Sequence, residues 1–351
     1  MSVFDGSNRK PAKPPLVCIC VPTYNTASTV RETLLSILAQ THKNLVVHIS
    51  DNASTDDTLK VIESIIDSRI TIHRQERNIG AEENFTKCIQ LATGKYTAIF
   101  HADDVYEPNM VEKQVAFLES NPDVGAVFSE AVTIDDKGSR FGVIGHAPGS
   151  KDGVARFGFR DLLQAMLLHY NFLVCPSVMV RSEIYSDEIR EWGSSLFKSS
   201  SDVDMWLKLT RVKEIAVLAE QLMSYRISDA QFSYTNRNRI ERADFFLVLE
   251  HYLAKPEVIN FITKNDLRHY GWLERHERVA RALNLFMLGR VSEAKGLLEG
   301  LFCWDSIFAG VVNRRGFVTL LGGLLLRMFI LCGLLKTGKK VIKSMRKVSW
   351  I

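Results

Sequence analysis

The sequence predicts an α/β fold, in which helices cover both faces of a mostly parallel sheet. Between residues 16 and 128, apolar runs of strand length are followed by segments whose apolar residues recur at helical spacing. Strand and helix patterns alternate five times, and the links between them are short. Parallel neighbours need crossover connections of this kind, so the alternation indicates a mostly parallel sheet.

The first predicted strand is the apolar run 16–21, and the helix after it has Val30, Leu34 and Ile37 on one face. The later strands and helices are predicted, in chain order, at 45–50, 59–66, 70–73, 85–92, 96–100, 108–118 and 124–128. Ligands of such sheets bind beyond the carboxyl ends of the strands. We therefore expect the loops after the first four strands to line one crevice.

The chain divides into four predicted segments. Its first residues combine proline and lysine without an apolar stretch, which predicts a disordered lead and not a signal peptide. Less regular sequence follows the sheet, and helical spacing then dominates to about residue 302. The segments are the lead at 1–15, the sheet domain at 16–235, a helical region at 236–305, and apolar and basic helices at 306–351.

Composition limits the classes of function. A chain of 351 residues with 46% hydrophobic and 24% charged residues is an ordinary globular protein. Its net charge of +4 is too small to indicate a nucleic-acid partner. The six cysteines fit neither a disulfide framework nor a zinc site, and Cys18 and Cys20 are predicted to be buried strand residues. Scattered thiols of this kind fit the cytosol.

The C-terminal segment carries a membrane signal. Residues 316–335 are apolar except for Arg327, and their number allows a transmembrane span. Arg327 lies in the middle, however, at a cost of roughly 2.5–3.5 kcal/mol, and basic residues flank both ends. We favour a helix that lies in the interface of an anionic leaflet. A true span, and a buried core or dimer helix, remain alternatives.

Polar residues follow each of the first four predicted strands. Each has a simple structural explanation, since Asp51 can form an Asx turn and Asn78 with Gly80 a tight turn. Their coincidence at the strand ends instead favours a ligand site, where Asp51 accepts a hydrogen bond from a base or ribose. The residues are Pro22, Thr23, Tyr24, Asn25, Asp51, Asn78, Gly80, His101, Asp103 and Asp104.

Asp103 and Asp104 follow a strand that is predicted to be buried. Two adjacent carboxylates repel each other, so they favour a hard divalent cation, which commonly bridges substrate phosphates. The alternative is a cap on the helix that begins near Pro108. Asp202 and Asp204 lie at the start of a later helix, where they either cap it and favour its dipole or include a general base.

In their order and spacing, these motifs resemble those of the family 2 glycosyltransferases of the GT-A fold. The resemblance covers residues 16 to about 235. It matches the opening motif at 22–25, the base-recognising aspartate at Asp51, the nucleotide loop at Asn78 and Gly80, the metal motif at Asp103 and Asp104, the catalytic aspartate at Asp202, and a closing segment at Tyr225, Arg226, Gln231 and Ser233. The chain departs from the pattern at His101, Asn52 and Ser201, where acids are common.

The resemblance implies a nucleotide-diphosphate-sugar donor, a UDP-sugar in particular, and Mn²⁺ or Mg²⁺ held by Asp103, Asp104 and His101. An imidazole ligand would favour Mn²⁺. It implies inverting transfer with Asp202 as base, or Asp204 in its place, and Arg226 on the diphosphate. The segments typical of processive synthases are missing, which indicates transfer of a single sugar.

By analogy with the family, the acceptor is expected to be a lipid-linked saccharide in bacterial surface polysaccharide synthesis, such as O-antigen or capsule. The apolar and basic C-terminus places the enzyme at an anionic membrane surface, as a peripheral protein on the cytoplasmic face of the inner membrane. The sequence is also compatible with a homo-oligomer.

Two rival functions remain. A nucleotidyltransferase should carry a glycine-rich phosphate loop with a basic residue after the first strand, and this chain has residues 22–25 there. A non-catalytic membrane-bound scaffold with a relic sheet domain would have lost Asp103, Asp104 or Asp202, and all three are present. A dinucleotide-binding Rossmann enzyme is disfavoured, because no G-x-G-x-x-G follows the first strand.

Overall fold

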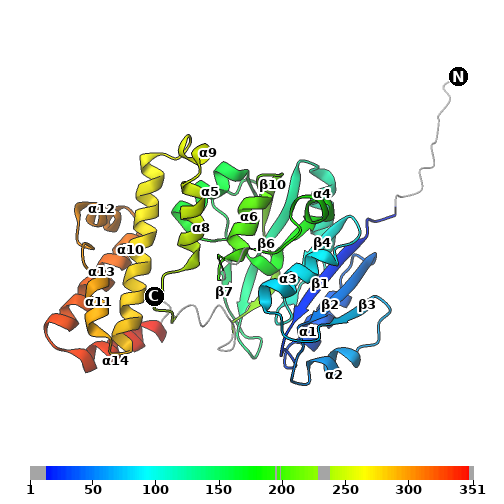
Figure 1. Ribbon diagram of the computed structural model, residues 1–351, viewed down its shortest axis with the longest axis horizontal. Helices are drawn as coiled ribbons and strands as arrows, with labels where there is room; N and C mark the ends of the chain where they lie inside the picture. The colour runs from blue at the N-terminus through cyan, green and yellow to red at the C-terminus, as the bar shows by residue number, and fades with distance from the viewer. Residues whose placement is uncertain (1–12, 194–195, 198, 228–237, 348–351) are drawn as a thin grey trace. The chain divides into compact units, whose positions relative to one another are not determined.

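The structure, a computed structural model, describes residues 13–193, 196–197, 199–227 and 238–347, with only the backbone at 345–347. Most of the predicted disordered lead lies outside the described residues, as do Gln231 and Ser233 of the predicted closing segment. The chain forms two compact units (Figure 1). The first comprises Met1–Gly158, Leu173–Trp192 and Lys208–Arg226, and the second Phe159–Phe172, Gly193–Leu207 and Ile227–Ile351.

The first unit contains a mixed sheet, in which the described strands follow the order β3-β2-β1-β4-β9-β6-β10-β5. The strands β1 to β4 are parallel, as are β6 and β10, which confirms the predicted fold class. The bounds are β1 Val17–Thr23, β2 Leu45–Asp51, β3 Ile70–Arg74, β4 Tyr96–Ile99, β5 Val105–Tyr106, β6 Val124–Ile134, β7 Arg140–Ile144, β8 Val154–Phe157, β9 Met179–Arg181 and β10 Glu214–Arg226.

Antiparallel strands complete this sheet where the sequence predicted none. The short β9 lies between β4 and β6 and pairs with both in antiparallel orientation. Strands β5 and β8 pair with β10, and β7 pairs with β6, again antiparallel. The sheet is therefore parallel on the side of the predicted donor loops and mixed on the other side.

Helices cover both faces of the parallel part, as predicted. Along β1, Val17, Ile19 and Val21 join a core cluster that includes residues of α1, α2 and α4. On the opposite face, Cys18 and Cys20 are fully buried, and the Cys20 Sγ lies 3.3 Å from the Cys88 carbonyl oxygen of α3. The helices of this unit are α1 Val30–Leu38, α2 Thr58–Glu63, α3 Ala81–Gln90 and α4 Met110–Ser120, with a short 3-10 turn at Cys175–Ser177 and a π-helix at Ile184–Glu188.

The second unit is helical and has a core of its own, formed mainly by α10, α11 and α13. Thr263 begins α10 with a reciprocal capping box to Asp266, and Gly289 (φ +85°) allows the turn into α11. The helices are α5 Phe159–His169, α6 Ser201–Leu209, α8 Asp244–Leu253, α9 Pro256–Ile259, α10 Lys264–Met287, α11 Val291–Leu297, α12 Trp304–Val312, α13 Arg314–Leu331 and α14 Leu335–Lys347.

The apolar segment 316–335 does not form one continuous helix. The helix α13 ends at Leu331, and Gly333 (φ +65°) turns the chain into α14. Asn313 caps the start of α13 by accepting a hydrogen bond from the Gly316 N–H at 2.7 Å. Within the described ranges, no helix combines the length and the apolar character that a membrane crossing requires.

Candidate functional site

The carboxyl ends of β1, β2 and β4 lie at one edge of the sheet. Thr23 and Asp51, the last residues of β1 and β2, are partners in register, and Ile99 at the end of β4 pairs with Cys20 of β1. The loops that follow these strands therefore begin side by side, as the sequence predicted. We call this region the carboxyl edge; it comprises residues 22–25, 51–55, 78–80 and 101–104.

Asp51 is completely buried at this edge, and its carboxylate is held by its own loop. It accepts hydrogen bonds from the Ser54 hydroxyl at 2.5 Å, from the Ser54 N–H at 3.1 Å and from the Thr23 hydroxyl at 3.3 Å. The local turn that the sequence offered as a simple explanation is thus present. Recognition of a base or ribose by Asp51 remains a prediction, and it would have to use this pre-positioned carboxylate.

Polar side chains tie the first three loops together. The Asn25 Oδ1 accepts a hydrogen bond from the Thr55 N–H at 2.8 Å, and Asn25 itself has a positive φ of +53°. Asn52 donates to the Asn78 Oδ1 at 3.0 Å and to the Gly80 carbonyl at 3.1 Å. Hydrogen bonds therefore join the first three loops of the carboxyl edge, and Tyr24, within the edge, is 43% exposed.

His101, Asp103 and Asp104 form a cluster at the end of β4. One ligand atom from each lies within 4.8 Å of the others. Asp104 is completely buried; its Oδ1 accepts the Arg226 N–H at 2.9 Å, whereas its Oδ2 has no hydrogen-bond partner among the described residues. The His101 Nε2 is likewise buried without a described partner.

The electrostatics of this cluster fit a divalent cation. Burial, followed by the nearby Asp103 charge, raises the pKa of the Asp104 carboxyl well above its ordinary value. Burial also lowers the pKa of His101, which leaves a neutral imidazole nitrogen able to act as a ligand. Two carboxylates and one imidazole are a donor set that Mn²⁺ accepts. The unsatisfied oxygen and nitrogen are the atoms that such an ion would satisfy.

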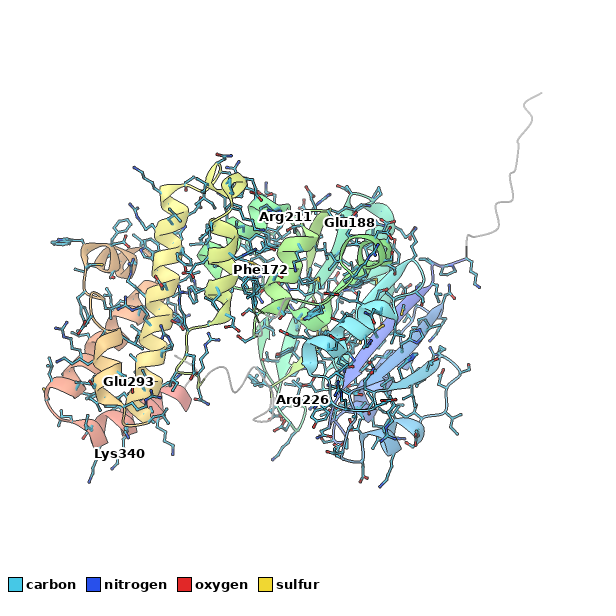
Figure 2. All side chains as sticks on the ribbon, viewed as in Figure 1. Phe172, Glu188, Arg211, Arg226, Glu293 and Lys340 are labelled. Carbon is cyan, nitrogen blue, oxygen red and sulfur yellow. The ribbon has the colours of Figure 1, made fainter. Side chains whose placement is uncertain are left out.

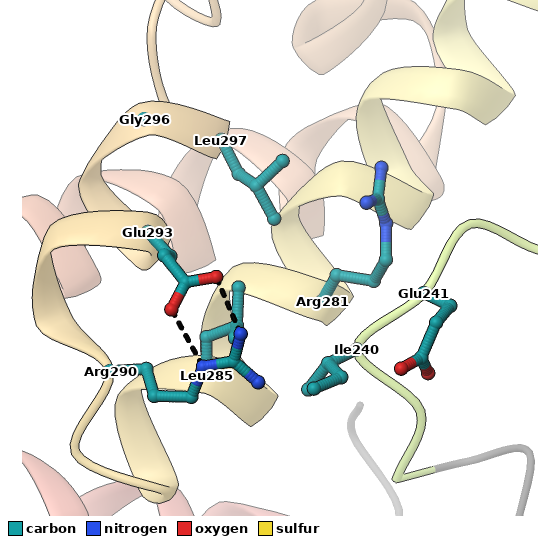
Figure 3. Close-up of a pocket in the computed structure, with 8 residues that line it drawn as sticks. All are labelled: Ile240, Glu241, Arg281, Leu285, Arg290, Glu293, Gly296 and Leu297. Atoms are coloured by element: carbon teal, nitrogen blue, oxygen red, sulfur yellow. Dashed lines mark hydrogen bonds and ion pairs between the residues drawn. The ribbon is translucent and has the colours of Figure 1, made fainter.

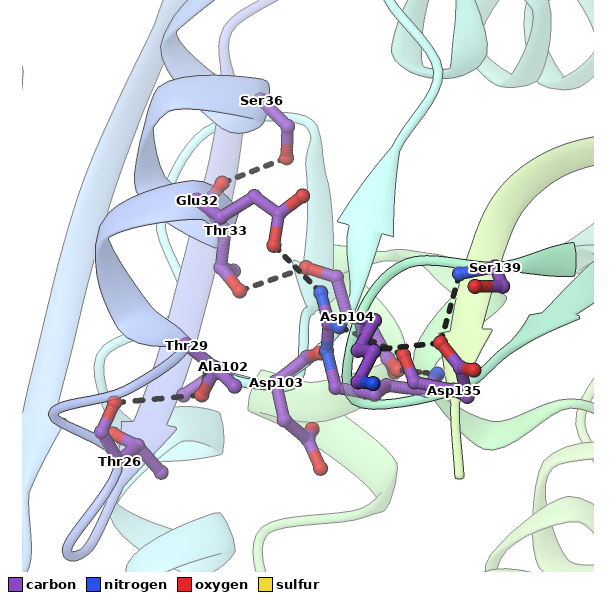
Figure 4. A network of polar contacts seen from close by, with 12 residues as sticks. Thr26, Thr29, Glu32, Thr33, Ser36, Ala102, Asp103, Asp104, Asp135 and Ser139 are labelled. Atoms are coloured by element: carbon purple, nitrogen blue, oxygen red, sulfur yellow. Dashed lines mark hydrogen bonds and ion pairs between the residues drawn. The ribbon is translucent and has the colours of Figure 1, made fainter. Parts of the chain in front are cut away.

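Arg226 holds the backbone of this cluster in place. Its guanidinium is almost fully buried and donates to the Asp103 carbonyl at 2.9 Å, the Asp135 carbonyl at 3.0 Å and the Glu32 carboxylate at 2.6 Å. Thr33 adds a hydrogen bond to the Asp104 carbonyl at 2.7 Å. Figure 4 shows the Asp103 carboxylate pointing away from this network.

This geometry gives Arg226 a role that the sequence did not predict. Its guanidinium nitrogens all donate to protein acceptors, so Arg226 positions the loop of residues 101–104, and contact with a diphosphate remains a prediction. Glu32 and Thr33 support the same loop and were missed. No sequence signal marks them, because Glu32 pairs with a residue 194 positions away.

Asp202 and Asp204, the predicted bases, belong to the second unit, in the first turn of α6. The Asp202 carboxylate is half-buried and accepts a hydrogen bond from the Asn171 side chain at 3.2 Å. Burial raises the pKa of Asp202 to about 6. Asp204 is 2% exposed and accepts the Tyr252 hydroxyl at 2.9 Å. Asp202 is therefore the more accessible of the two carboxylates.

The sequence profile of Glycosyl transferase family 2 matches residues 18–188, which include the carboxyl edge. An uncharacterized glycosyltransferase of Rickettsia prowazekii is 32% identical over 249 residues, which cover 70% of this chain and 74% of that protein. The chain belongs to glycosyl transferase family 2. The Escherichia coli UDP-Glc:alpha-D-GlcNAc-diphosphoundecaprenol beta-1,3-glucosyltransferase WfaP is 35% identical over 105 residues, 30% of this chain and 42% of that protein.

Solved structures show the same fold for this glycosyltransferase. S. aureus TarS 1–349 in complex with UDP-GlcNAc aligns over 94% of this chain and 91% of its own, with a TM-score of 0.56 and 15% identity. The mannosyltransferase PcManGT from Pyrobaculum calidifontis, in complex with GDP-Man and Mn²⁺, aligns over 95% and 90%, with a TM-score of 0.51 and 16% identity. The likeness establishes a GT-A fold with C-terminal helices.

Proposed function

We propose that this family 2 glycosyltransferase moves one sugar from a UDP-sugar to a lipid-linked saccharide and needs a divalent cation to do so. The proposal rests mainly on two buried atoms at the carboxyl edge, the His101 Nε2 and the Asp104 Oδ2, which have no hydrogen-bond partner among the described residues and lie next to Asp103. They lie in the place where a sheet of this kind binds its ligand.

The carboxyl edge is assigned to the donor. Asp51 would accept a hydrogen bond from the nucleoside, with the loop of Pro22, Thr23, Tyr24 and Asn25 on one side and Asn78 with Gly80 on the other. Asp103, Asp104 and His101 would hold Mn²⁺ or Mg²⁺. Such an ion would neutralise the negative charge that develops on a diphosphate leaving group. PcManGT with GDP-Man and Mn²⁺ supports a metal at this fold, and TarS with UDP-GlcNAc supports uridine.

Asp202 is assigned as general base, with Asp204 as the alternate. Its carboxylate would take the proton of an acceptor hydroxyl, which attacks the anomeric carbon from the face opposite the diphosphate, so the configuration inverts. A pKa of about 6 keeps Asp202 ionised at neutral pH and still basic enough for this role. The bond of Asp204 to buried Tyr252 makes Asp204 less suited to the same task.

The acceptor and its location complete the proposal. The name of WfaP specifies a sugar on diphosphoundecaprenol, which supports a lipid-linked acceptor for the present protein as well. We place the enzyme at the cytoplasmic face of a bacterial inner membrane, in synthesis of a surface polysaccharide such as O-antigen or capsule. The basic and apolar C-terminus supports contact with an anionic membrane surface.

Calorimetric titration with UDP and GDP, each with and without Mn²⁺, tests the proposal. We expect UDP to bind tightly only with the metal, and Asp103→Ala to abolish that binding. Asp187→Ala, an exposed acid elsewhere in the first unit, serves as the matched control and should bind as the wild type does. Binding of neither nucleotide under any condition would favour a non-catalytic scaffold instead.

A further inference from the structure

The outward face of α13 is apolar and exposed. Its residues follow one another at intervals of four, three, four and three, which places them on a single face of the helix. They are Phe317, Leu321, Leu324, Met328 and Leu331, with exposures between 41% and 68%. The opposite face, which includes Leu326 and Phe329, packs into the core of the second unit. Other described residues leave these five side chains exposed on the outward face.

The neighbouring helix α12 extends this surface. Trp304 is 86% exposed and Val311 81% exposed, and Ile307, Phe308 and Val312 are exposed as well. Glycines let the two helices approach closely, because a Cβ at Gly316 would lie 2.3 Å from the Ala309 carbonyl oxygen. We call the exposed apolar residues of α12 and α13 together the α12–α13 face. Exposed apolar side chains gathered on two helices that pack against each other mark an interaction site.

The charge around this face selects its partner. After Asp305 the chain has no acidic residue and nine basic ones: Arg314, Arg315, Arg327, Lys336, Lys339, Lys340, Lys343, Arg346 and Lys347. Lys340 projects outward from α14 (Figure 2). A symmetric contact between two copies would bring these like charges together, because each copy presents the same surface. An anionic bilayer complements both the apolar face and the charge.

A cavity of about 540 Å³ opens beside the face, between α5, α10, α12 and α13. Phe308 and Val312 belong both to the cavity wall and to the α12–α13 face. The complete lining is Leu168, His169, Asn265, Arg268, His269, Trp272, Leu273, Phe308, Val312, Asn313, Arg315 and Gly316, which includes two arginines, two histidines and no acid. We call it the basic cavity.

A second pocket of this unit shows how different that lining is (Figure 3). Arg281 and Arg290 line it together with Glu241 and Glu293, and Arg290 forms an ion pair with Glu293 at 2.6 Å. In the basic cavity, the Arg268 charge is partly balanced, because its Nε lies 3.6 Å from the Oδ1 of Asp305, an acid outside the lining. Arg315 donates to the Leu168 and His169 carbonyls, at 2.8 and 3.2 Å, and forms no ion pair with an acid among the described residues. The positive charge of Arg315 is therefore not balanced, so the basic cavity favours an anion.

We propose that the α12–α13 face rests on an anionic bilayer and that the basic cavity takes the phosphate of a lipid headgroup. The proposal rests on the membrane location given above but not on the transfer reaction. Arg268 and Arg315 would donate to the phosphate oxygens, as arginine does at planar or tetrahedral oxyanions. Trp304 would lie at the level of the headgroups, where exposed tryptophans of membrane proteins gather.

Sedimentation of the full chain with vesicles tests the face. Wild type should sediment with vesicles that contain phosphatidylglycerol and remain in solution with pure phosphatidylcholine. Leu321→Glu combined with Leu324→Glu should weaken binding roughly tenfold or more, because charged side chains replace two exposed leucines that would enter the bilayer. Ile66→Glu, at a 99% exposed position in the first unit, is the matched control and should bind as the wild type does.

Arg268→Gln tests the basic cavity. One basic residue near a charged surface contributes about 1 kcal/mol, so the variant should bind phosphatidylglycerol vesicles roughly fivefold more weakly. Arg31→Gln, which removes an exposed arginine of the first unit, should not change vesicle binding. Thermal melting of every variant shows whether it is folded, and UDP titration of the same samples reports the donor site separately.

Equal sedimentation with neutral and anionic vesicles, or unchanged binding by the leucine variants, would overturn the proposal. A wild-type dimer in solution that the leucine variants dissociate would assign the face to a second copy. If UDP fails to bind while the vesicle results hold, the proposed function is wrong and the docking surface stands. The reverse pattern leaves the donor site intact and removes the docking surface.

Discussion

The carboxyl edge of the first unit and the α12–α13 face of the second depart from ordinary packing in opposite ways. At the edge, the His101 Nε2 and the Asp104 Oδ2 are polar and buried without a described partner. On the face, apolar side chains such as Leu324 and Trp304 are exposed. Folded proteins usually satisfy buried polar atoms and cover apolar surface, so each departure points to a binding partner. We propose a divalent cation as the partner of the edge and an anionic bilayer as the partner of the face.

We assign catalysis to the carboxyl edge of the first unit and membrane contact to the second unit. Asp202 tests whether the second unit also takes part in catalysis. Asp202 lies in the second unit, yet it is predicted to act in chemistry. We expect Asp202→Asn to lower turnover by roughly 10²–10⁴-fold, since it removes a general base, while UDP affinity and vesicle binding stay unchanged. Asp204→Asn is the paired variant. Near-normal turnover in Asp202→Asn would move the base to Asp204 or to another group.

Substitution of Arg226 tests how far the carboxyl edge depends on the hydrogen bonds of its guanidinium. Arg226→Met leaves the Asp103 and Asp135 carbonyls without their donor, so we expect a loss of about 2–4 kcal/mol in the free energy of unfolding. Affinity for Mn²⁺ should fall roughly 10–100-fold, as it does when residues that orient metal ligands are removed. Denaturant unfolding and metal titration measure the two effects.

Arg69→Met is the control for Arg226. Arg69 also pairs with an acid, Asp67, and donates to a carbonyl, that of Leu38, but among the described residues it forms no hydrogen bond or ion pair with the carboxyl edge. The Arg69→Met variant should have a lower free energy of unfolding and the same affinity for Mn²⁺ as the wild type. Equal metal affinity in wild type and Arg226→Met would show that Arg226 does not position the metal loop.

The pH dependence of turnover sharpens the assignment of Asp202. Burial raises its pKa to about 6, and a base must be ionised to act. Turnover should therefore be full above about pH 7 and fall roughly tenfold for each pH unit below 6. The profile is measured at two saturating Mn²⁺ concentrations. An acid limb that moves with the metal concentration would report protonation of metal ligands and contradict the assignment.

His101→Asp should give the smallest effect. It replaces the imidazole at the carboxyl edge by the acid that is common in the family. An all-carboxylate donor set is harder, so the variant should shift the metal preference from Mn²⁺ toward Mg²⁺ while it keeps the dependence on a metal. Turnover at matched concentrations of the two ions measures the shift. An unchanged preference would mean that His101 does not contact the ion.

Periodicity predicted the parallel strands β1 to β4 and the start of β6, but it missed β10, which is parallel to β6, and the antiparallel strands. The strands β1, β2 and β4 are mostly apolar and buried between polar loops, so their sequence pattern is clear. The strands β5 and β9 have two and three residues, too few to show an alternation, and β9 pairs with β4 and β6 only through tertiary contacts. Local sequence carries no information about such a pairing.

The sequence predicts those parts of the candidate site whose positions follow from the ends of parallel strands. Thr23, Asp51 and Asp103 converge because parallel strands end at one edge, which their sequence positions imply. The contact between Glu32 and Arg226 could not be predicted, because nothing local pairs them. The sequence also could not predict which face of α13 is exposed. That helix is apolar on both faces, so its sequence does not show which one is buried.

The most direct test of the central claim is release of UDP from a panel of UDP-sugars, measured before and after removal of divalent metal by chelation. We predict that the wild-type protein releases UDP from at least one donor, that chelation abolishes the release, and that Mn²⁺ restores it. In Asp103→Ala, added Mn²⁺ should have no effect. Full turnover in the chelated wild-type protein would contradict the account, because the carboxyl edge would then act without a cation.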